Sequence, residues 1–341
     1  KKEFNSTIEE IRRDGFTIVA ELDTLPLTDT KVAMVEFVGR TTVECGRVFV
    51  ERRPDVVLVL GDRGEQLAAA IAAAYLDIPV AQLHAGELSG SVDHPVRYAI
   101  SQMATIHCTS TEDDAERVRS MLGDRARHVH CTGAPALDTI TTLQPTSKER
   151  LLADVGLQGD QSLLLFIQHP DTLDALSPVE QLQPSLKVLE SFDGNIVIFG
   201  SNADAGGMAM NALLQKFVQG RKNARFIQSA VHGTYLPWMA AADVLVGNSS
   251  SGIIEAASFH LPVVNVGGRQ KGRMRSGNVL DVPYDADDIR KAIHRALTDT
   301  SFRAALQQCK NLYGDGQAAG RIASILSAFL MEHPTASRYT S

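Results

Sequence analysis

The sequence is poor in cysteine, lacks long apolar runs and has no excess of positive charge. Its few cysteines are scattered without CxxC spacing and indicate neither a disulfide framework nor a redox or metal motif: Cys45, Cys108, Cys131 and Cys309. No segment has the apolar length that a secretory or transmembrane segment needs. The formal net charge of −7 argues against nucleic acid or an anionic membrane as a partner, because such binding needs a dense basic face. We therefore expect a cytoplasmic protein whose local arginines could still hold a small anionic ligand.

Short apolar runs alternate with segments of helical period along the chain. In the first half, "DVVLVLG" (55–61) precedes the alanine-rich "EQLAAAIAAAYLD", and "IPVAQLHAG", "ATIHCTS" and "RHVHCTG" follow with helical segments between them. The pattern restarts with "SLLLFIQ" (162–168) and continues through "GNIVIFG", "ARFIQSA", "DVLVG" and "LPVVNVG". Such alternation predicts parallel sheets flanked by helices, with ligands beyond the carboxyl ends of the strands.

The length of the chain favours two domains. It has 341 residues, of which 44% are hydrophobic. The polar stretch "LQPTSKE", at about 143–149, is the candidate linker. We therefore predict an α/β fold with two Rossmann-like domains facing a cleft, residues 1–145 and 146–341, with the last helices packing back on the first domain.

The chain begins unlike a usual doubly wound domain. A polar segment of helical period, "KKEFNSTIEEIRRDGF", comes first, and "TIVAEL" (17–22) is predicted to be a strand. The buried first strand and glycine-rich turn with which such a domain usually starts are missing. Two explanations stay open: the natural protein starts upstream, which we favour, or this copy does without that strand.

The stretch "VGNSSSGIIEAASF" (246–259) places three serines and a glycine between a predicted strand and a predicted helix. Backbone N–H groups and serine hydroxyls at such a turn can donate to a phosphate, and the helix dipole adds attraction for an anion. Ser249, Ser250 and Ser251 could equally cap the helix, which is serine's usual role at such a position. The turn alone leaves both interpretations open.

Two nearby features favour a nucleoside diphosphate over bare phosphate. Glu255 lies four residues after Ser251, where its carboxylate could accept from two ribose hydroxyls. Arginine matches diphosphate oxygens in a bidentate way. The glycine-rich stretch "VGGRQKGRMRSGNVLDV" gathers several cations: Arg269, Lys271, Arg273 and Arg275. A solvated basic loop is the other interpretation, and it suits Lys271 and Arg275 better than Arg269.

Polar residues also follow the predicted strands of the first half. "LGDRGE" puts Asp62 and Arg63 directly after a buried strand. "HAGELSGSVDHPVR" does the same after the next strand, with a group of ionisable residues: His84, Glu87, Asp93, His94 and Arg97. Asp93 could be a helix N-cap or a reactive carboxylate, and Arg97 could hold that carboxylate ionised or bind substrate.

"FIQHPDT" places His169 at the end of the first strand of the second half. A lone histidine at a strand end is more often structural than reactive. Here it is predicted to face the cleft opposite two carboxylates, so both roles stay open.

Together these motifs resemble the hydrolysing sugar-nucleotide 2-epimerases, which make N-acetylmannosamine-type sugars for sialic, legionaminic and related nonulosonic acids. The resemblance covers essentially the whole chain and is carried by motifs in the right order: "LGDR", "HAGELSGSVDHPVRYAIS", "QHPDT", "NADAGG", "DVLVGNSSSGIIEA", "GGRQKGR" and "YGDG". It implies the GT-B-like architecture shared with many glycosyltransferases, with the nucleotide on residues 146–341 and the sugar on the side of residues 1–145. Non-hydrolysing relatives typically read "TDSGG" and "GDTTT" where this chain reads "GNSSSG" and "GDRGE", which favours the hydrolysing branch.

The resemblance implies roles for individual residues. One set resembles the family's nucleotide-binding residues: Arg63, Asn202, Ser249, Ser250, Glu255 and Arg269. A second set resembles its catalytic residues: Asp62, Asp93, Arg97 and His169, with Glu87 and His84 beside them. A UDP-sugar substrate, a UDP product and a homodimer or homotetramer are implied as well. Neither a cofactor nor a metal is expected.

The chain also departs from the family pattern. His84 stands where many members have a glutamate, a choice that resembles the branch acting on bacillosamine-type sugars. His94 replaces the second acid that usually follows Asp93. The missing leading strand removes the family's "GTR"-type loop, which normally lines the active site. The sugar is therefore less well defined by the sequence than the reaction.

The reaction implied is elimination of the nucleoside diphosphate to a 2-acetamidoglycal, followed by hydration that gives the free 2-epimeric sugar. Two alternatives stay open. A GT-B glycosyltransferase would share the nucleotide site but would not need the carboxylates at Asp62 and Asp93. A non-catalytic protein that binds nucleotide-sugars would fit the missing strand and His94.

Overall fold

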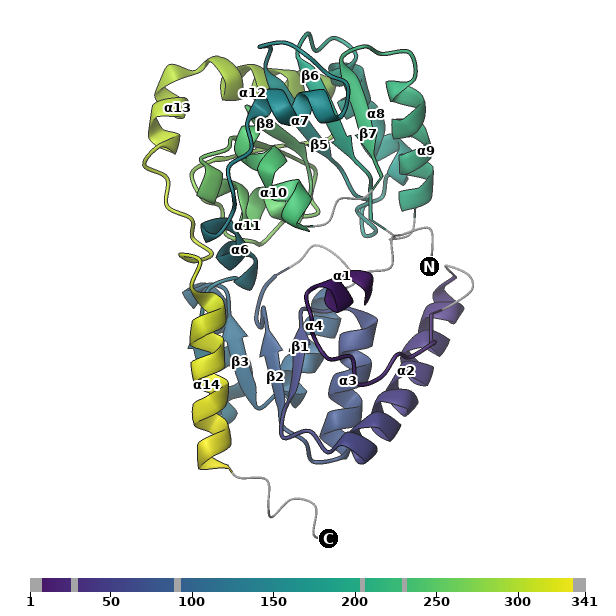
Figure 1. Ribbon diagram of the computed structural model, residues 1–341, viewed down its shortest axis with the longest axis vertical. Helices are drawn as coiled ribbons and strands as arrows, with labels where there is room; N and C mark the ends of the chain where they lie inside the picture. Colours follow the sequence, from purple (N-terminus) through teal and green to yellow (C-terminus); the bar gives the residue numbers. More distant parts are fainter. Residues whose placement is uncertain (1–7, 26–29, 89–92, 203–205, 229–231, 334–341) are drawn as a thin grey trace. The chain divides into compact units, whose positions relative to one another are not determined.

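The computed structural model describes residues 8–25, 30–88, 93–202, 206–228 and 232–333. Residue contacts divide the chain into two units (Figure 1). The first comprises Lys1–Glu87, Asp93–Thr132 and Gly320–Ser341, and the second comprises Leu88–Val92 and Gly133–Ala319. Each unit is built on its own parallel sheet, which confirms the prediction of an α/β fold with parallel strands.

Within the described residues, the first unit has a four-stranded sheet in the order β1-β2-β3-β4. Its strands are β1 (Val57–Leu60), β2 (Val80–Leu83), β3 (Ile106–Thr109) and β4 (Val129–Cys131). Its helices are α1 (Ile8–Arg13), α2 (Lys31–Arg52), α3 (Gly64–Tyr75), α4 (Asp93–Met103), α5 (Glu112–Leu122), the short 3-10 helix η2 (Gly123–Arg125) and α14, which begins before the boundary of the unit (Ala318–Glu332). α2 packs on α3, α3 on β1, and α5 on β4 (Figure 1).

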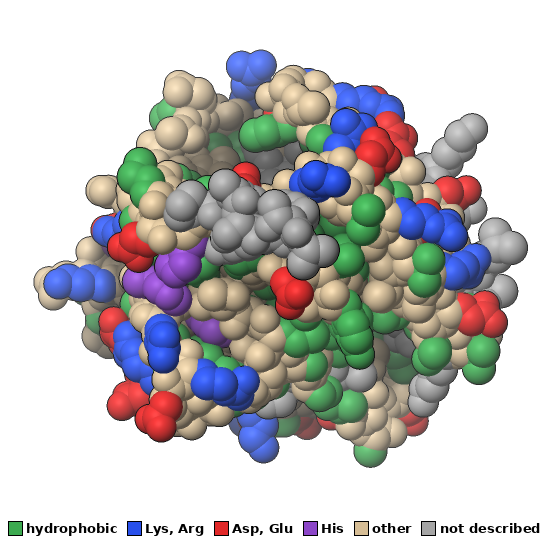
Figure 2. Space-filling model, turned by 90° about the horizontal axis from the view of Figure 1, so that it is seen from below, with side chains coloured by type: hydrophobic (Ala, Val, Ile, Leu, Met, Phe, Trp, Pro, Cys, Tyr) green, Lys and Arg blue, Asp and Glu red, His purple; other side chains and the backbone are tan. Residues whose placement is uncertain are grey.

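The core of the first unit lies where these helices cover the sheet. β2 and β3 are buried along their whole length, as is typical of parallel strands covered on both faces. β1 alternates instead, and its Leu58 and Leu60 are 48% and 53% exposed. Phe329 of α14 packs against His128 in a T-shaped arrangement, with the ring centroids 5.3 Å apart. Histidine side chains gather on the face of the molecule shown in Figure 2.

The second unit, where described, has a six-stranded sheet in the order β10-β9-β8-β5-β6-β7. Its strands are β5 (Leu163–Ile167), β6 (Asn195–Phe199), β7 (Ala224–Ile227), β8 (Val244–Gly247), β9 (Val263–Val266) and β10 (Val279–Val282). Its helices are η3 (Pro135–Leu137), α6 (Asp138–Thr141), α7 (Lys148–Asp154), α8 (Pro178–Leu189), α9 (Gly207–Val218), α10 (His232–Ala241), α11 (Ser250–Ile254), η4 (Ala256–Phe259), α12 (Ala286–Thr298) and α13 (Thr300–Leu306). Buried side chains fill both faces of this sheet, since successive residues of β5 and β8 belong alternately to two core clusters.

The strand order of the second unit reverses between β5 and β8. The chain runs from β5 outward to β6 and β7, and then returns to pair β8 with the other edge of β5. Gly247 ends β8 with φ 131°, and a Cβ there would lie 1.9 Å from the carbonyl oxygen of Ile167, so glycine lets the two strand ends approach closely. In open α/β sheets the ligand crevice lies outside the carboxyl ends of the strands at such a switch point.

Three segments differ from the predictions. "TIVAEL" (17–22) forms no strand, because the strands of the first sheet, as far as it is described, pair only with one another. α2 is not among the predicted helices, since exposed apolar residues such as Val35 and Val43 blur its apolar stripe. β10 lies in the stretch for which a basic loop was one interpretation. It was not predicted because this edge strand is short and contains the exposed Asp281.

Candidate active site

A group of ionisable residues lies at the carboxyl ends of β1 and β2. Asp62 follows β1, His84 and Glu87 follow β2, and Arg97 lies in α4. Because the two strands pair in parallel, with Leu60 opposite Leu83, their loops leave the sheet at the same edge. The structure thus brings together four of the predicted catalytic residues: Asp62, His84, Glu87 and Arg97.

Arg97 is the buried centre of this group, with 3% of its surface exposed. Its Nη2 donates to the carboxylate of Asp62, and its Nη1 donates to the backbone oxygen of His84 at 2.8 Å. Oε2 of Glu87 lies 3.9 Å from the same Nη1. The planar fork of a guanidinium suits such a two-sided contact, so Arg97 fixes Asp62 relative to the turn after β2.

Glu87, which is 2% exposed, receives donors from two different strand ends. His84 Nδ1 lies 2.5 Å from its Oε1, and the hydroxyl of Ser110 donates to the same oxygen at 2.6 Å. His84 has a left-handed backbone, with φ 55°. Non-glycine residues adopt this conformation uncommonly, and they do so often at functional sites.

Three buried polar residues that were not predicted support this group. Gln82 Nε2 donates to the backbone oxygen of Arg97 at 3.1 Å, and Ser101 donates to Gln82 Oε1 at 2.6 Å. Both side chains are fully buried, and Ser110 is 2% exposed. The available signals were a glutamine inside the apolar strand "VAQL" and a serine directly after "IHCT".

Two other predicted residues of the first unit have different outcomes. The side chain of Arg63 is 68% exposed and pairs with Glu65, Nε to Oε1 at 2.7 Å. Asp93 is the first residue of α4, but its side chain and that of His94 lie outside what the structure describes. The catalytic role of Asp93 therefore stays a prediction.

In the second unit, Asn248 ties together the ends of β5 and β8 at the switch point. This fully buried side chain accepts from the backbone N of His169 at 2.7 Å and donates to the backbone O of His169 at 2.8 Å. Its own backbone oxygen accepts from Arg269 Nη1 at 3.3 Å and from Gln270 Nε2 at 2.8 Å. Asn248 and Gln270 are not among the predicted site residues, although both stand inside motifs that were.

The serine turn begins α11. Ser249 is the N-cap, and its hydroxyl lies 2.9 Å from that of Ser251, which in turn lies 2.8 Å from the hydroxyl of Tyr235. Burial raises the pKa of the Tyr235 phenol, so this chain of hydroxyls carries no charge. Glu255 is 7% exposed at the C-terminal end of the helix. The capping interpretation thus holds for Ser249, and phosphate binding stays a prediction.

His169 is neutral in this setting. Burial, with a contribution from Arg269, lowers its pKa from the usual 6.5 to about 3. Its Nδ1 accepts from the backbone N of Asn202 at 3.1 Å, so in the neutral ring the proton sits on Nε2. The structure therefore brings together His169, Asn202 and, through Asn248, Arg269, and it leaves Nε2 of His169 as a hydrogen-bond donor.

We expect His169→Asn to make the protein less sensitive to acid. The folded histidine stays neutral between pH 6.5 and about 3, whereas the unfolded one takes up a proton below 6.5. Wild type therefore loses stability as the pH falls through that window, by at most about 1.4 kcal/mol per pH unit. Asparagine can still accept from the N–H of Asn202 but does not titrate. Urea unfolding across the window should show wild type losing stability relative to His169→Asn as the pH falls, and parallel curves would contradict the assignment.

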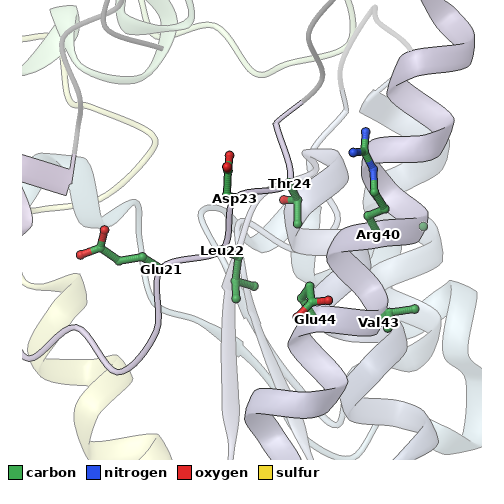
Figure 3. Close-up of a pocket in the computed structure, with 8 residues that line it drawn as sticks. Glu21, Leu22, Asp23, Thr24, Arg40, Val43 and Glu44 are labelled. Carbon is green, nitrogen blue, oxygen red and sulfur yellow. The ribbon is translucent and has the colours of Figure 1, made fainter.

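Each unit has a cavity among its described residues. One of about 390 Å³ lies in the first unit between the extended segment after α1 and helix α2, and no predicted site residue lines it (Figure 3). Another of about 420 Å³ in the second unit is lined by Asp174, Gly267, Gly268, Asp281, Val282, Pro283 and Tyr284, of which Gly267 and Gly268 directly precede Arg269 in the chain. Among the described residues, no group of three or more His, Cys, Asp or Glu side chains is arranged to hold a metal ion.

In the described parts of the chain, no helix combines the length and the apolar character needed to cross a membrane.

The family model described as UDP-N-acetylglucosamine 2-epimerase matches residues 1–327. A UDP-N,N'-diacetylbacillosamine 2-epimerase (hydrolyzing) from Legionella pneumophila is 36% identical over 323 residues, which is 95% of this chain and 84% of that protein. A GDP/UDP-N,N'-diacetylbacillosamine 2-epimerase (hydrolyzing) from Campylobacter jejuni is 31% identical, covering 86% of this chain and 76% of that protein.

A solved structure shares the fold. The UDP-GlcNAc 2-epimerase from Neisseria meningitidis, solved bound to UDP-GlcNAc, has a TM-score of 0.80 at 18% identity and covers 93% of this chain and 87% of its own. The expected fold, and the expectation that the chain is an enzyme of the resembled family, are confirmed. The chain belongs to the UDP-N-acetylglucosamine 2-epimerase family.

Proposed function

We propose that this enzyme converts a UDP-sugar bearing a 2-acetamido group, plus water, into UDP and the free 2-epimeric sugar. The observation that carries the proposal is the 36% identity, over 95% of the chain, to a relative named as a hydrolysing UDP-sugar 2-epimerase. The buried group of Asp62, Glu87 and Arg97 at the carboxyl edge of the first sheet supports it, because the reaction needs proton transfer as well as nucleotide binding.

The proposed chemistry has two steps. A base takes the proton from C2 of the sugar while the C1–O bond breaks, and that bond's electron pair leaves on the diphosphate of UDP, giving a 2-acetamidoglycal. Water then adds its hydroxyl at C1, and a proton adds to C2 on the face opposite the one deprotonated. No carbonyl stabilises negative charge at C2. The departing diphosphate must therefore take up the developing charge, and hydrogen-bond donors to it lower the barrier.

In the first unit, we assign proton transfer to carboxylates and His84. Glu87 and Asp93 are the proposed acid and base. His84, which is hydrogen-bonded to Glu87, is proposed to take part in the second proton transfer, the one that returns a proton to C2. Asp62 and Arg97 hold the turn after β2 in place, since Arg97 bridges the carboxylate of Asp62 and the backbone of His84.

In the second unit, we assign nucleotide binding to the switch point between β5 and β8. Ser249 and Ser250 would donate to the diphosphate, Glu255 would accept from the ribose hydroxyls, and Arg269 would neutralise the leaving group. Arg63 stays a predicted nucleotide-binding residue. Asn202 and His169 act together: the Asn202 N–H orients the ring so that Nε2–H of neutral His169 can donate to the substrate.

The preferred sugar is a 2,4-diacetamido-trideoxyhexose, with N-acetylglucosamine as the alternative. The relative at 36% identity is named for a diacetylbacillosamine substrate, and His84 stands where many members of the resembled family have a glutamate. We further propose that the product feeds nonulosonic acid synthesis and that the enzyme works as a homodimer or homotetramer.

The test is incubation of the enzyme with both UDP-sugars in deuterium oxide. We expect release of UDP and a free sugar inverted at C2 that carries deuterium there, because solvent replaces the proton removed. A glycosyltransferase has no reason to exchange that hydrogen, and a non-catalytic binding protein would release no UDP. A released sugar that is unlabelled or unepimerised at C2 would overturn the elimination mechanism.

A first variant tests the serine turn. No described residue is hydrogen-bonded to the Ser250 hydroxyl, so Ser250→Ala removes a ligand donor without removing a bond of the fold. A hydrogen bond to a charged group contributes about 1.5–3 kcal/mol, so we expect the Kd for UDP to rise about 10–150-fold. Calorimetric titration measures this.

Ser258→Ala is the matched control, because that hydroxyl accepts only from Asn311 among described residues and lies beyond Glu255 in the chain. It should bind UDP like wild type. Equal UDP affinities for Ser250→Ala and wild type would show that the Ser250 hydroxyl does not bind the diphosphate, and capping would remain the role of the turn.

A further inference from the structure

Side-chain atoms of His84, Glu87 and Ser110 form a triangle of short contacts. Ser110 Oγ lies 2.6 Å from Glu87 Oε1 and 2.9 Å from His84 Nδ1, and that Nδ1 lies 2.5 Å from the same carboxylate oxygen. Ser110 directly follows β3, whereas His84 and Glu87 belong to the turn after β2. The neighbouring strands are locked in register, with Leu83 opposite Cys108. The serine therefore reaches the pair from a separate, rigid part of the sheet.

The donors and acceptors of this triangle can be assigned. With Glu87 ionised, its carboxylate only accepts, so the hydrogen on His84 Nδ1 points at Glu87. The single proton of the Ser110 hydroxyl goes to the same carboxylate, since an Nδ1 that donates cannot accept. Nε2 of His84 is then the ring nitrogen left to exchange a proton outside the triangle.

Glu87 also has a competing partner. Its Oε2 lies 3.9 Å from Arg97 Nη1, close enough that a small rotation of the carboxylate would form a charge-assisted hydrogen bond with the arginine. Such a rotation would move Oε1 away from His84. The hydroxyl of Ser110, which is 2% exposed, donates to Oε1 alongside His84 Nδ1 and so opposes this rotation from a separate strand end.

We propose that Ser110 is a positioning residue that holds Glu87 against His84 and thereby sets the tautomer of His84, with the proton on Nδ1 and Nε2 free for proton transfer. The inference rests on the proposed function, because it concerns the same acid–base group. Ser110 acts through Glu87 and touches no reacting atom itself.

Kinetics of Ser110→Ala, Ser110→Thr and Thr109→Val test the proposal. The alanine variant loses one donor to a charged group, so kcat should fall about 10–150-fold while KM and the Kd for UDP stay near wild type. Threonine keeps the hydroxyl and should restore most of kcat. Thr109 is the matched control: its buried hydroxyl, one residue earlier, donates to the backbone oxygens of Thr111 and His130, so Thr109→Val should keep the wild-type kcat.

Nitrogen NMR of histidine-labelled protein provides a readout that a merely structural role would not move. The His84 signal, identified by its loss in His84→Gln, should report the Nδ1–H form in wild type and in Ser110→Thr. In Ser110→Ala it should shift toward the Nε2–H form. Because this signal needs no turnover, it tests Ser110 even if the proposed reaction fails.

Two results would overturn the proposal. One is an Nε2–H signal for His84 in the wild-type protein, which can be read even if Ser110→Ala does not fold. The other is a folded Ser110→Ala variant with wild-type kcat and an unchanged His84 signal.

Discussion

Replacing Arg97 by methionine is expected to lower the free energy of unfolding by about 3–5 kcal/mol, because removing one partner of a buried ion pair leaves the other charge uncompensated. Arg97 is 3% exposed, and its loss would leave Asp62 without that guanidinium and remove the bond to the His84 backbone. Urea unfolding measures the change. Lysine at this position should restore little, since its point charge cannot bridge the two acceptors as the guanidinium fork does.

Arg63→Met is the natural comparison. Arg63 follows the same strand, but its side chain and that of Glu65 are 68% and 37% exposed. Exposed ion pairs contribute about 0–1 kcal/mol, so this variant should unfold almost like wild type. If both arginines cost the same stability, Arg97 would be no more than another surface charge, and its proposed role in holding the turn after β2 would fail.

The described strands other than β10 could be predicted from the sequence, and the fully buried ones were clearest because parallel strands covered on two faces are continuous apolar runs. "SLLLFIQ" and "DVLVG" are of this kind, and they form β5 and β8. Their order in the sheet could not be predicted, since the alternating pattern is the same whichever edge of β5 receives β8. That order is what creates the switch point and brings His169 beside Asn248.

The predictions failed where contacts between distant parts of the chain determine whether a segment forms a strand. "TIVAEL" has the alternation of a strand, yet it is not assigned as a strand and is not part of the described four-stranded sheet. β10 fails in the opposite way: the residues of "VLDV" are only partly buried, but β9 lies beside it as a partner.

The candidate site was predictable where charged residues follow strands, and less so where neutral ones do. Asp62, Glu87 and Arg97 stand out because buried charges are rare and need partners. Ser110, Gln82 and Asn248 are uncharged, and their partners lie far from them in the chain, so the sequence does not indicate which residues they contact. Ser110 lies 23 residues from Glu87 in the chain, and only the register of β2 with β3 brings the two side chains together.

Glu87→Gln is expected to reduce kcat by about two to four orders of magnitude, the usual contribution of a positioned acid or base. The amide keeps the size of the side chain, and its oxygen can still accept from His84 and Ser110, so the local packing should survive. What is lost is the negative charge that can take up a proton. Steady-state kinetics with the preferred UDP-sugar, together with calorimetric titration of UDP, measures the effect. UDP binding and thermal stability should stay near wild type.

Combining Glu87→Gln with Ser110→Ala then decides how the two residues are connected. If Ser110 acts only by holding the carboxylate, removing the serine from a protein that already lacks the carboxylate should cost almost nothing more, because residues in one hydrogen-bonded network do not add. Independent roles would instead multiply the two losses in kcat. A folded Glu87→Gln enzyme with near wild-type kcat would exclude Glu87 as the acid or base, and Asp93 would become the first residue to examine in its place.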